Sequence, residues 1–249
     1  PAPRRRGRAV LAAGAAVLIA AALAVLWTTR APRSLESARA RILARDPQPA
    51  TLNVLVLTLD TLRADRLGCY GARDGATPNL DALAAGGIVF ENATATVPLT
   101  LPSHSTIFTG LNPPRHGVRD NGGFFLGEDA TTLAERLRAA GLATGAVVAA
   151  WVLDSKWGLA QGFDHYSDHF DLSKHKTLSL GSVQKRGDDV VSDALAWLEG
   201  VKDRRFFGWI HLYDPHTPYD PPEPYASRYP RRPYVGEVAY TDEQVGRVL

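Results

Sequence analysis

The sequence contains no methionine and only one cysteine, Cys69. A single cysteine excludes an internal disulfide, so cysteine content does not reveal the redox compartment. Because methionine is absent and the first residue is Pro1, we expect an N-terminus that has been processed or trimmed. The formal net charge is only +2, and no global excess of basic residues indicates a nucleic-acid partner. The length of 249 residues suits one α/β domain with a sizeable core.

An uncharged run dominated by Ala, Leu and Val lies near the N-terminus, at positions 9–27. At about 1.5 Å per residue, a helix of this length just spans a hydrocarbon layer of roughly 30 Å. The arginines of segment 4–8 precede it, which places the N-terminus in the cytoplasm. A cleaved signal peptide is the alternative, with Ala22-Leu23-Ala24 as its cleavage site. We expect an uncleaved transmembrane anchor, because the apolar run is long.

With this anchor, we expect the chain to consist of four segments. Residues 1–8 form a cytoplasmic basic tail, 9–27 the anchor or signal sequence, and 28–51 a juxtamembrane linker. The folded domain is expected at 52–249, on the extracytoplasmic side of the cell membrane, with its C-terminal part incomplete.

Short apolar runs alternate with helical patterns throughout the predicted domain. Strands are expected at 53–60, 88–95, 143–150 and 206–212, and helices at 77–87, 102–109, 132–140 and 188–198, with a further helix starting at 241. This alternation predicts an α/β fold with a mostly parallel central sheet and helices on both faces. Ligand-binding residues in such sheets lie beyond the carboxyl ends of the strands.

Two residues separated by about 40 positions carry the strongest functional signal. Asp60 ends the apolar run 54–59, where a carboxylate is costly unless it forms a pair, caps a turn or binds a cation. Thr100 precedes a short helical pattern, so its hydroxyl is expected beside free backbone N–H groups that stabilise anions. The plainer alternatives are an Asx turn or helix cap at Asp60, and an ordinary N-cap at Thr100 or Ser103.

The order of these segments resembles the sulfatase branch of the alkaline-phosphatase superfamily. Sulfatases carry Cys or Ser, any residue, Pro, any residue and Arg, followed by a helix that ends in Thr-Gly. Four residues here match that frame: Thr100, Pro102, Thr109 and Gly110. Segments 59–65, 77–81, 113–117 and 211–219 also resemble family segments in the same order. The resemblance therefore covers most of 53–249 and implies the N-terminal part of the sulfatase-like fold.

Several positions depart from the sulfatase pattern. Thr100 stands where sulfatases carry the Cys or Ser that becomes formylglycine, His104 replaces the arginine, and Thr61 replaces a second acidic metal ligand. Segment 141–147 lacks the Lys and His of the second family signature. A threonine nucleophile is typical of relatives that act on phosphate diesters. Such a hydroxyl needs a metal or a base to attack.

The resemblance implies a set of site residues. Asp60 and Thr100 are expected to hold a divalent metal, and Thr100 and His104 to be catalytic. His216 is expected to contact the sulfate or phosphate group. Its alternative is a turn residue bonded to Asp214 or Asp220.

Two arginines complete the expected site. Arg63 and Arg115 are further candidates for substrate binding, although Arg115 could equally lie on a solvated loop. His211, within the last strand pattern, is interpreted as structural.

We therefore expect a membrane-anchored, metal-dependent hydrolase of sulfuric or phosphoric esters, whose substrate is a small molecule, a glycan or a lipid ester. The metal is Ca, Mg, Mn or Zn, and the visible carboxylate and hydroxyl ligands favour a hard cation. The alternatives are a phosphoglycerol- or phosphoethanolamine-type transferase and a binding module without activity. No Asp-His pair follows Leu212 to supply the second ligand set of the family, so we expect the 249 residues alone to be inactive.

Overall fold

The computed structural model describes residues 36–37, 40, 44, 52–170 and 183–249. The chain divides into two compact units, Pro1–Pro49 and Ala50–Leu249, and only the second is described further. The predicted anchor at 9–27 and most of the linker at 28–51 lie outside the described residues. Within the described part, none of the helices combines the length and the apolar character that crossing a membrane requires.

A four-stranded parallel sheet forms the centre of the second unit. Its strands are β1 (Val54–Leu59), β2 (Ala143–Val148), β3 (His165–Ser167) and β4 (Phe206–Leu212), in the order β1-β4-β2-β3. All three pairings are parallel, which confirms the predicted sheet type. Because β1 and β4 are neighbours, the segments that follow their carboxyl ends lie at the same edge of the sheet.

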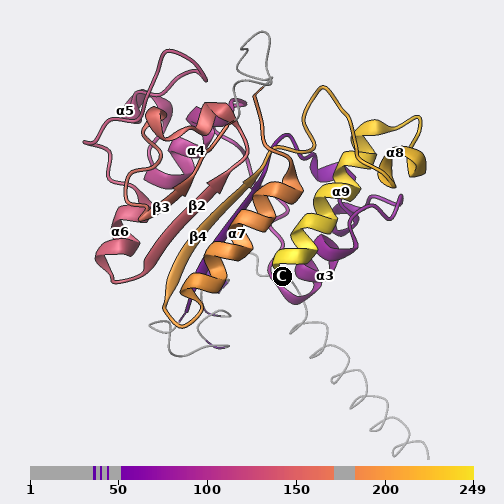
Figure 1. The fold of residues 1–249 in the computed structure, drawn as a ribbon, viewed down its shortest axis with the longest axis horizontal. Helices are drawn as coiled ribbons and strands as arrows, with labels where there is room; N and C mark the ends of the chain where they lie inside the picture. The colour runs from indigo at the N-terminus through magenta and orange to yellow at the C-terminus, as the bar shows by residue number, and fades with distance from the viewer. Residues whose placement is uncertain (1–35, 38–39, 41–43, 45–51, 171–182) are drawn as a thin grey trace, which may run out of the picture. The chain divides into compact units, whose positions relative to one another are not determined.

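Two helices cover opposite faces of this sheet. On β4, Trp209 and His211 point towards α4 (Thr100–Thr109), where their rings meet the ring of His104. Gly208, one residue out of phase, lies against Trp197 of α7 (Gly187–Val201) on the other face. The expectation of helices on both faces is thus confirmed (Figure 1).

The described residues of the unit form five further α-helices: α3 (Pro78–Gly86), α5 (Pro113–His116), α6 (Leu133–Ala139), α8 (Tyr225–Arg228) and α9 (Pro233–Val248). The helix α6 begins with a capping box between Thr132 and Glu135, as its sequence favours. The helix α9 packs against α3, α7 and α8. A small second core, which includes Tyr225 and Tyr240, fills the space between α8 and α9.

Several sequence-based expectations differ from the structure. The predicted strand at 88–95 is irregular backbone, and the side chain of Phe90 is 56% exposed. The last helix begins at Pro233 rather than at residue 241, and α4 begins at Thr100 rather than at Pro102. The three-residue strand β3 was not predicted, because so short a segment carries no periodic signal.

Close packing of α7 on the sheet depends on two glycines in register. Gly145 of β2 pairs with Gly208 of β4, and Trp197 lies over both. A Cβ atom on Gly145 would come within 2.2 Å of the Trp197 ring. The absence of both Cβ atoms therefore lets the indole ring lie against the backbone of the sheet.

We expect Gly145→Ala to lower the free energy of unfolding by about 2 kcal/mol, because overpacking a dense core forces its neighbours to shift. Urea unfolding followed by circular dichroism measures this loss. Gly200→Ala, in the same helix as Trp197 but with nothing within 4 Å of its Cβ, is the matched control. It should stabilise the protein by roughly 0.5–1 kcal/mol, as Ala does relative to Gly in a helix. Equal effects of the two substitutions would contradict this role of Gly145.

Candidate active site

Asp60 and Thr100 meet at the carboxyl edge of the sheet. Asp60 directly follows β1, and its backbone N–H donates to Leu212 O at 3.0 Å, which continues the pairing with β4. Thr100 is the first residue of α4, and its Oγ1 donates to Asp60 Oδ2 at 3.1 Å. The structure thus brings together the two residues that the sequence predicts as metal ligands, 40 positions apart.

Thr100 does not have the plain capping role that the sequence left open. The residue that precedes α4 is Leu99, and no side chain at that position caps the helix. Instead, Asn121 Oδ1 accepts a hydrogen bond from the backbone N–H of Leu101 at 2.9 Å. Because Asn121 satisfies this N-terminal donor, the hydroxyl of Thr100 remains directed at the carboxylate of Asp60.

Two histidines lie beside this pair, on the face of the sheet that α4 covers. His104, one turn into α4, donates from Nδ1 to Thr100 O at 2.7 Å. His211 of β4 is fully buried, and its Nε2 lies 3.6 Å from Asp60 Oδ2. The two imidazole rings are 5.1 Å apart and nearly perpendicular. His211, interpreted as structural from the sequence, therefore faces the site.

Burial and the neighbouring histidines set the charge of the site. Burial alone would raise the pKa of Asp60, but the neighbouring imidazole of His211, that of His104 and the hydrogen bond from Thr100 outweigh it and lower the pKa. Burial, followed by repulsion from His211, lowers the pKa of His104 to about 4. Asp60 is therefore ionised and His104 neutral at pH 7. Since a carbonyl can only accept, the proton of His104 is on Nδ1, and Nε2 keeps its lone pair.

His216 follows β4 in the loop 214–220. Its ring stacks on Tyr213 at 4.2 Å between centroids, and the Tyr213 hydroxyl lies 3.4 Å from Nε2. The Nδ1 atom donates to Thr217 O at 2.7 Å. The ring partners of His216 are thus Tyr213 and Thr217, rather than the Asp214 or Asp220 of the alternative interpretation.

Neither of the two predicted substrate-binding arginines forms a hydrogen bond or ion pair with Asp60 or Thr100 in the structure. Arg63 forms a two-point hydrogen-bonded ion pair with Asp65, and both side chains are exposed. Arg115 is exposed on the short helix α5. Its neighbour His116 is buried, with Nε2 3.1 Å from Thr106 Oγ1. Both arginines remain predictions as substrate ligands.

The chemistry of the Asp60–Thr100 pair fits part of a divalent-cation site. A carboxylate and a hydroxyl are suitable oxygen ligands for a hard cation. Beside them, both ring nitrogens of His211 and Nε2 of His104 are buried without a hydrogen-bond partner. No group of three or more acidic, His or Cys side chains placed to hold a metal occurs in the described part of the chain. These residues therefore fit as some of the ligands of a cation and do not by themselves complete its shell.

An α/β fold that joins a hydroxyl and a carboxylate at the carboxyl edge of its sheet has a candidate ligand site where folds of this class bind their ligands. Comparison with known proteins identifies the family. The family model described as "Sulfatase" matches residues 52–249. The chain therefore belongs to the sulfatase family.

Individual relatives agree with this family. The chain is 39% identical to human arylsulfatase A over 139 residues, which cover 53% of this chain and 25% of that protein. It is 31% identical to N-acetylglucosamine-6-O-sulfatase of Bacteroides thetaiotaomicron over 180 residues, covering 68% and 31% of the two chains. A protein solved with its substrate D-glucosamine-2-N,6-O-disulfate superimposes with a TM-score of 0.60 at 27% identity, covering 72% and 37%. The matched region thus spans about a quarter to a third of these two curated relatives.

Several residues at this edge were missed by sequence reasoning. Asn121, Tyr213 and His211 are polar or aromatic residues within otherwise apolar or glycine-rich segments. Only the hydrogen bond from Leu101 across 20 positions reveals the role of Asn121. The polar character of His211 in an apolar strand was a usable signal of a site, because burying an imidazole costs free energy unless the ring has a polar partner.

Proposed function

We propose that this protein hydrolyses sulfate esters, with Thr100 as the nucleophile. The observation that carries the proposal is the hydrogen bond from Thr100 Oγ1 to Asp60 Oδ2, within the region that matches the sulfatase family. The named relatives act on aryl sulfates and on sulfated amino sugars, so we propose the same substrate classes here.

The chemistry of Thr100 follows from its surroundings. Oγ1 forms a bond to the ester sulfur while the bond from sulfur to the alcohol oxygen breaks. The proton of Thr100 passes to Asp60 Oδ2, its hydrogen-bond acceptor, and from there to the departing alkoxide. Water then attacks the sulfated threonine, which releases sulfate and restores the hydroxyl.

We propose that Asp60 and Thr100 are ligands of a divalent metal. Because its pKa is lowered, the Asp60 carboxylate is a weak base and does not deprotonate the threonine hydroxyl efficiently by itself. When bound, a divalent cation would lower the pKa of the hydroxyl and stabilise negative charge on the ester oxygens. His104 holds the backbone of Thr100 in place, because its ring Nδ1 donates a hydrogen bond to the carbonyl oxygen of Thr100. His216 is proposed to contact the anionic group, with Arg63 and Arg115 as outer substrate ligands.

We also propose that residues 9–27 anchor the protein in the cell membrane, with the catalytic domain on the extracytoplasmic side. The support is the uncharged run itself and the arginines that precede it. Extraction of the protein from membranes by detergent, but not by high salt or carbonate, is the expected behaviour of such an anchor.

Comparison of three esters by the complete gene product tests the proposed activity. We expect 4-nitrophenyl sulfate to be hydrolysed with a kcat/KM at least about tenfold above that of 4-nitrophenyl phosphate or bis(4-nitrophenyl) phosphate. A chelator should abolish the activity, and added divalent cation should restore it. A preference for the phosphate diester would replace the proposal with the phosphoryl-transfer alternative. Binding without turnover of any ester would favour the inactive binding module.

A further inference from the structure

Few residues contact the imidazole ring of His216. Apart from its neighbours Tyr213 and Thr217, no other ring partner of His216 is seen among the described residues. The position of the imidazole is therefore set by the backbone of the loop 214–220. Three side chains hold that backbone through contacts between the loop and distant segments.

The first is Glu237, in the N-terminal half of α9. Its side chain is only 2% exposed, although carboxylates are rarely buried without a partner. Glu237 Oε1 accepts a hydrogen bond from the backbone N–H of Asp220 at 2.6 Å. Burial raises the pKa of Glu237 to about 7, and the backbone hydrogen bonds from the loop oppose that rise. The loop is thus the main polar environment of this carboxyl group.

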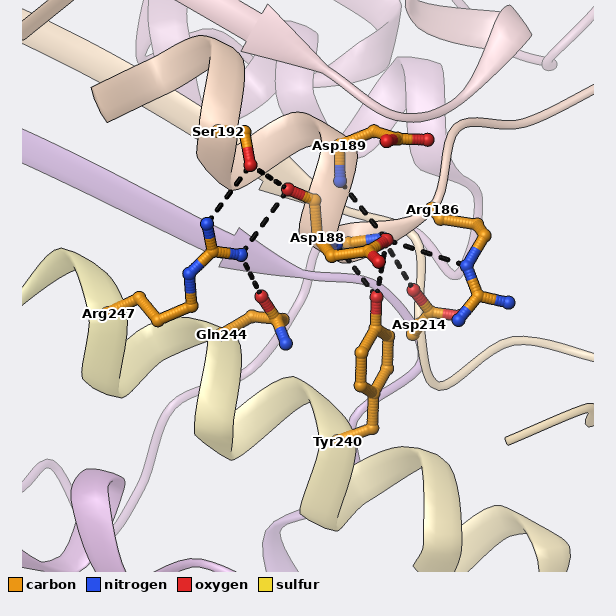
Figure 2. Close-up of polar contacts among 9 residues, drawn as sticks. Arg186, Asp188, Asp189, Ser192, Asp214, Tyr240, Gln244 and Arg247 are labelled. Carbon is orange, nitrogen blue, oxygen red and sulfur yellow. Dashed lines mark hydrogen bonds and ion pairs between the residues drawn. The ribbon is translucent and has the colours of Figure 1, made fainter. Parts of the chain in front are cut away.

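The second is Asp214, the first residue of the loop. Its Oδ2 accepts from the backbone N–H of Gly187 at 3.2 Å, at the N-terminus of α7. Gly187 has little space around it, because a Cβ would lie 3.2 Å from Asp214 Oδ2 and 3.4 Å from Tyr240. Figure 2 shows Asp214 directed at this helix end, with Tyr240 reaching it from α9.

The helices α7 and α9 are themselves joined beside this contact. The Tyr240 hydroxyl donates to Asp188 Oδ1 at 2.9 Å and lies 2.8 Å from the backbone nitrogen of Asp188. Arg247 of α9 donates to Ser192 Oγ at 3.0 Å (Figure 2). The two helices therefore form one support, from which Asp214 and Glu237 are positioned.

The third side chain is Thr61, which follows the predicted metal ligand Asp60. Its hydroxyl donates to Pro215 O, in the loop. Thr61 adopts a left-handed backbone with φ of 49°, which is unusual for a β-branched residue. This conformation is one that a tertiary contact has to hold. The contact links the loop of His216 to the backbone beside Asp60.

We propose that Asp214 and Glu237 are positioning residues that fix the His216 loop on the α7–α9 support, so that His216 faces the sulfate group bound at Asp60 and Thr100. This inference rests on the proposed function for the role of His216. The holding of the loop itself depends only on the contacts described above.

Hydrogen exchange of individual amides tests the holding of the loop. In Glu237→Ala, the amide of Asp220 should exchange about tenfold faster, which is the loss of one hydrogen bond. In Asp214→Ala, the amide of Gly187 should respond in the same way. Glu237→Gln retains an acceptor and should restore most of the protection. The control Glu243→Ala alters an exposed carboxylate of the same helix, which accepts from Tyr225, and should leave both amides unchanged.

Amides of β4 show whether a variant has merely lost global stability. Faster exchange at Trp209 and Ile210, equal to that at Asp220, would mean general destabilisation and would overturn the proposal. Unchanged exchange at Asp220 in Glu237→Ala would overturn it as well.

A double-variant cycle in the complete gene product tests the link to His216. Glu237→Ala should raise KM for 4-nitrophenyl sulfate and lower kcat/KM by up to about 100-fold, as displaced site groups do. Added to His216→Ala, it should cause no further loss, because its effect passes through that residue. Additive losses would overturn the link. If the wild type hydrolyses no sulfate ester, the proposed function fails, while the exchange measurements still decide whether the two carboxyl groups hold the loop.

Discussion

Replacing Thr100 with alanine is expected to reduce kcat for 4-nitrophenyl sulfate by at least about 1000-fold, because removal of a covalent nucleophile leaves only binding and electrostatic effects. The hydroxyl donates to Asp60 Oδ2 and does not cap α4, so its loss should leave the fold intact. The thermal midpoint should therefore change little. Steady-state kinetics of the complete gene product, together with a thermal melt, measures both effects.

Two further variants make this prediction specific. Thr100→Ser keeps a hydroxyl at the same place and should retain turnover within roughly tenfold of the wild type. Thr109→Ala makes the same substitution at the other end of α4, where the hydroxyl donates to Ser105 O, and should leave kcat unchanged. Full activity of Thr100→Ala would refute the nucleophile assignment, even if sulfate esters are the substrates.

This test matters because the family membership does not decide the nucleophile. Sulfatases are expected to carry Cys or Ser at this position for conversion to formylglycine, and this chain carries Thr100. The local geometry is that of an unmodified hydroxyl beside an ionised carboxylate. An active Thr100 would therefore take up the sulfate group as a simple alkoxide, and water would have to attack the sulfur of the sulfated threonine directly to release it.

The sequence predicts the central elements where the signal is local and continuous. The strand 206–212 was predicted with its observed ends, because a short apolar run rich in aromatic residues favours a strand over a helix. The run at 88–95 opens with Ile88, Val89 and Phe90 but forms no strand. Composition reports the preference for an extended backbone, whereas a strand also needs a neighbour to accept its hydrogen bonds. Nothing local in a sequence shows whether that neighbour exists.

In the candidate site, too, some residues could be predicted from the sequence and others could not. Asp60 and Thr100 were predicted because a resemblance to a family places them together, and the structure joins them by a hydrogen bond. Glu237 could not be predicted from its surroundings, which resemble any amphipathic helix. Its role appears only through Asp220, 17 positions earlier in the chain, and through burial that the sequence does not reveal. Contacts that hold a site are thus harder to predict than the groups that define it.

The C-terminal half of α9 carries a second buried carboxylate, Asp242, which is 1% exposed. Its two oxygens accept from the backbone N–H groups of Leu80 at 2.8 Å and Asn79 at 3.0 Å, in the first turn of α3. The Asn79 side chain donates to Asp242 Oδ2 as well, at 2.9 Å. A carboxylate from one helix therefore caps the N-terminus of another, where its charge also complements the helix dipole.

We expect Asp242→Ala to lower the free energy of unfolding by about 3 kcal/mol, since it removes a cap and leaves backbone donors without a partner. For a domain of this size, the thermal midpoint should fall by roughly 10 °C. Glu243→Ala, the exposed neighbour in the same helix, should cost far less. In a cycle with Asn79→Ala, the double variant should lose less than the sum of the two single losses, because both substitutions break the same contact.

Loss of this cap should also be felt at the site. The helix α9 contacts the His216 loop through Glu237 and the helix α3 through Asp242. Loss of the contact with α3 should therefore make the C-terminal half of α9 less stable, and with it the α7–α9 support of the loop. We therefore expect Asp242→Ala to speed amide exchange in α3 first, and in the loop 214–220 only as α9 itself opens. Faster exchange in the loop with α3 still protected would contradict the assignment of Asp242 as the cap of α3.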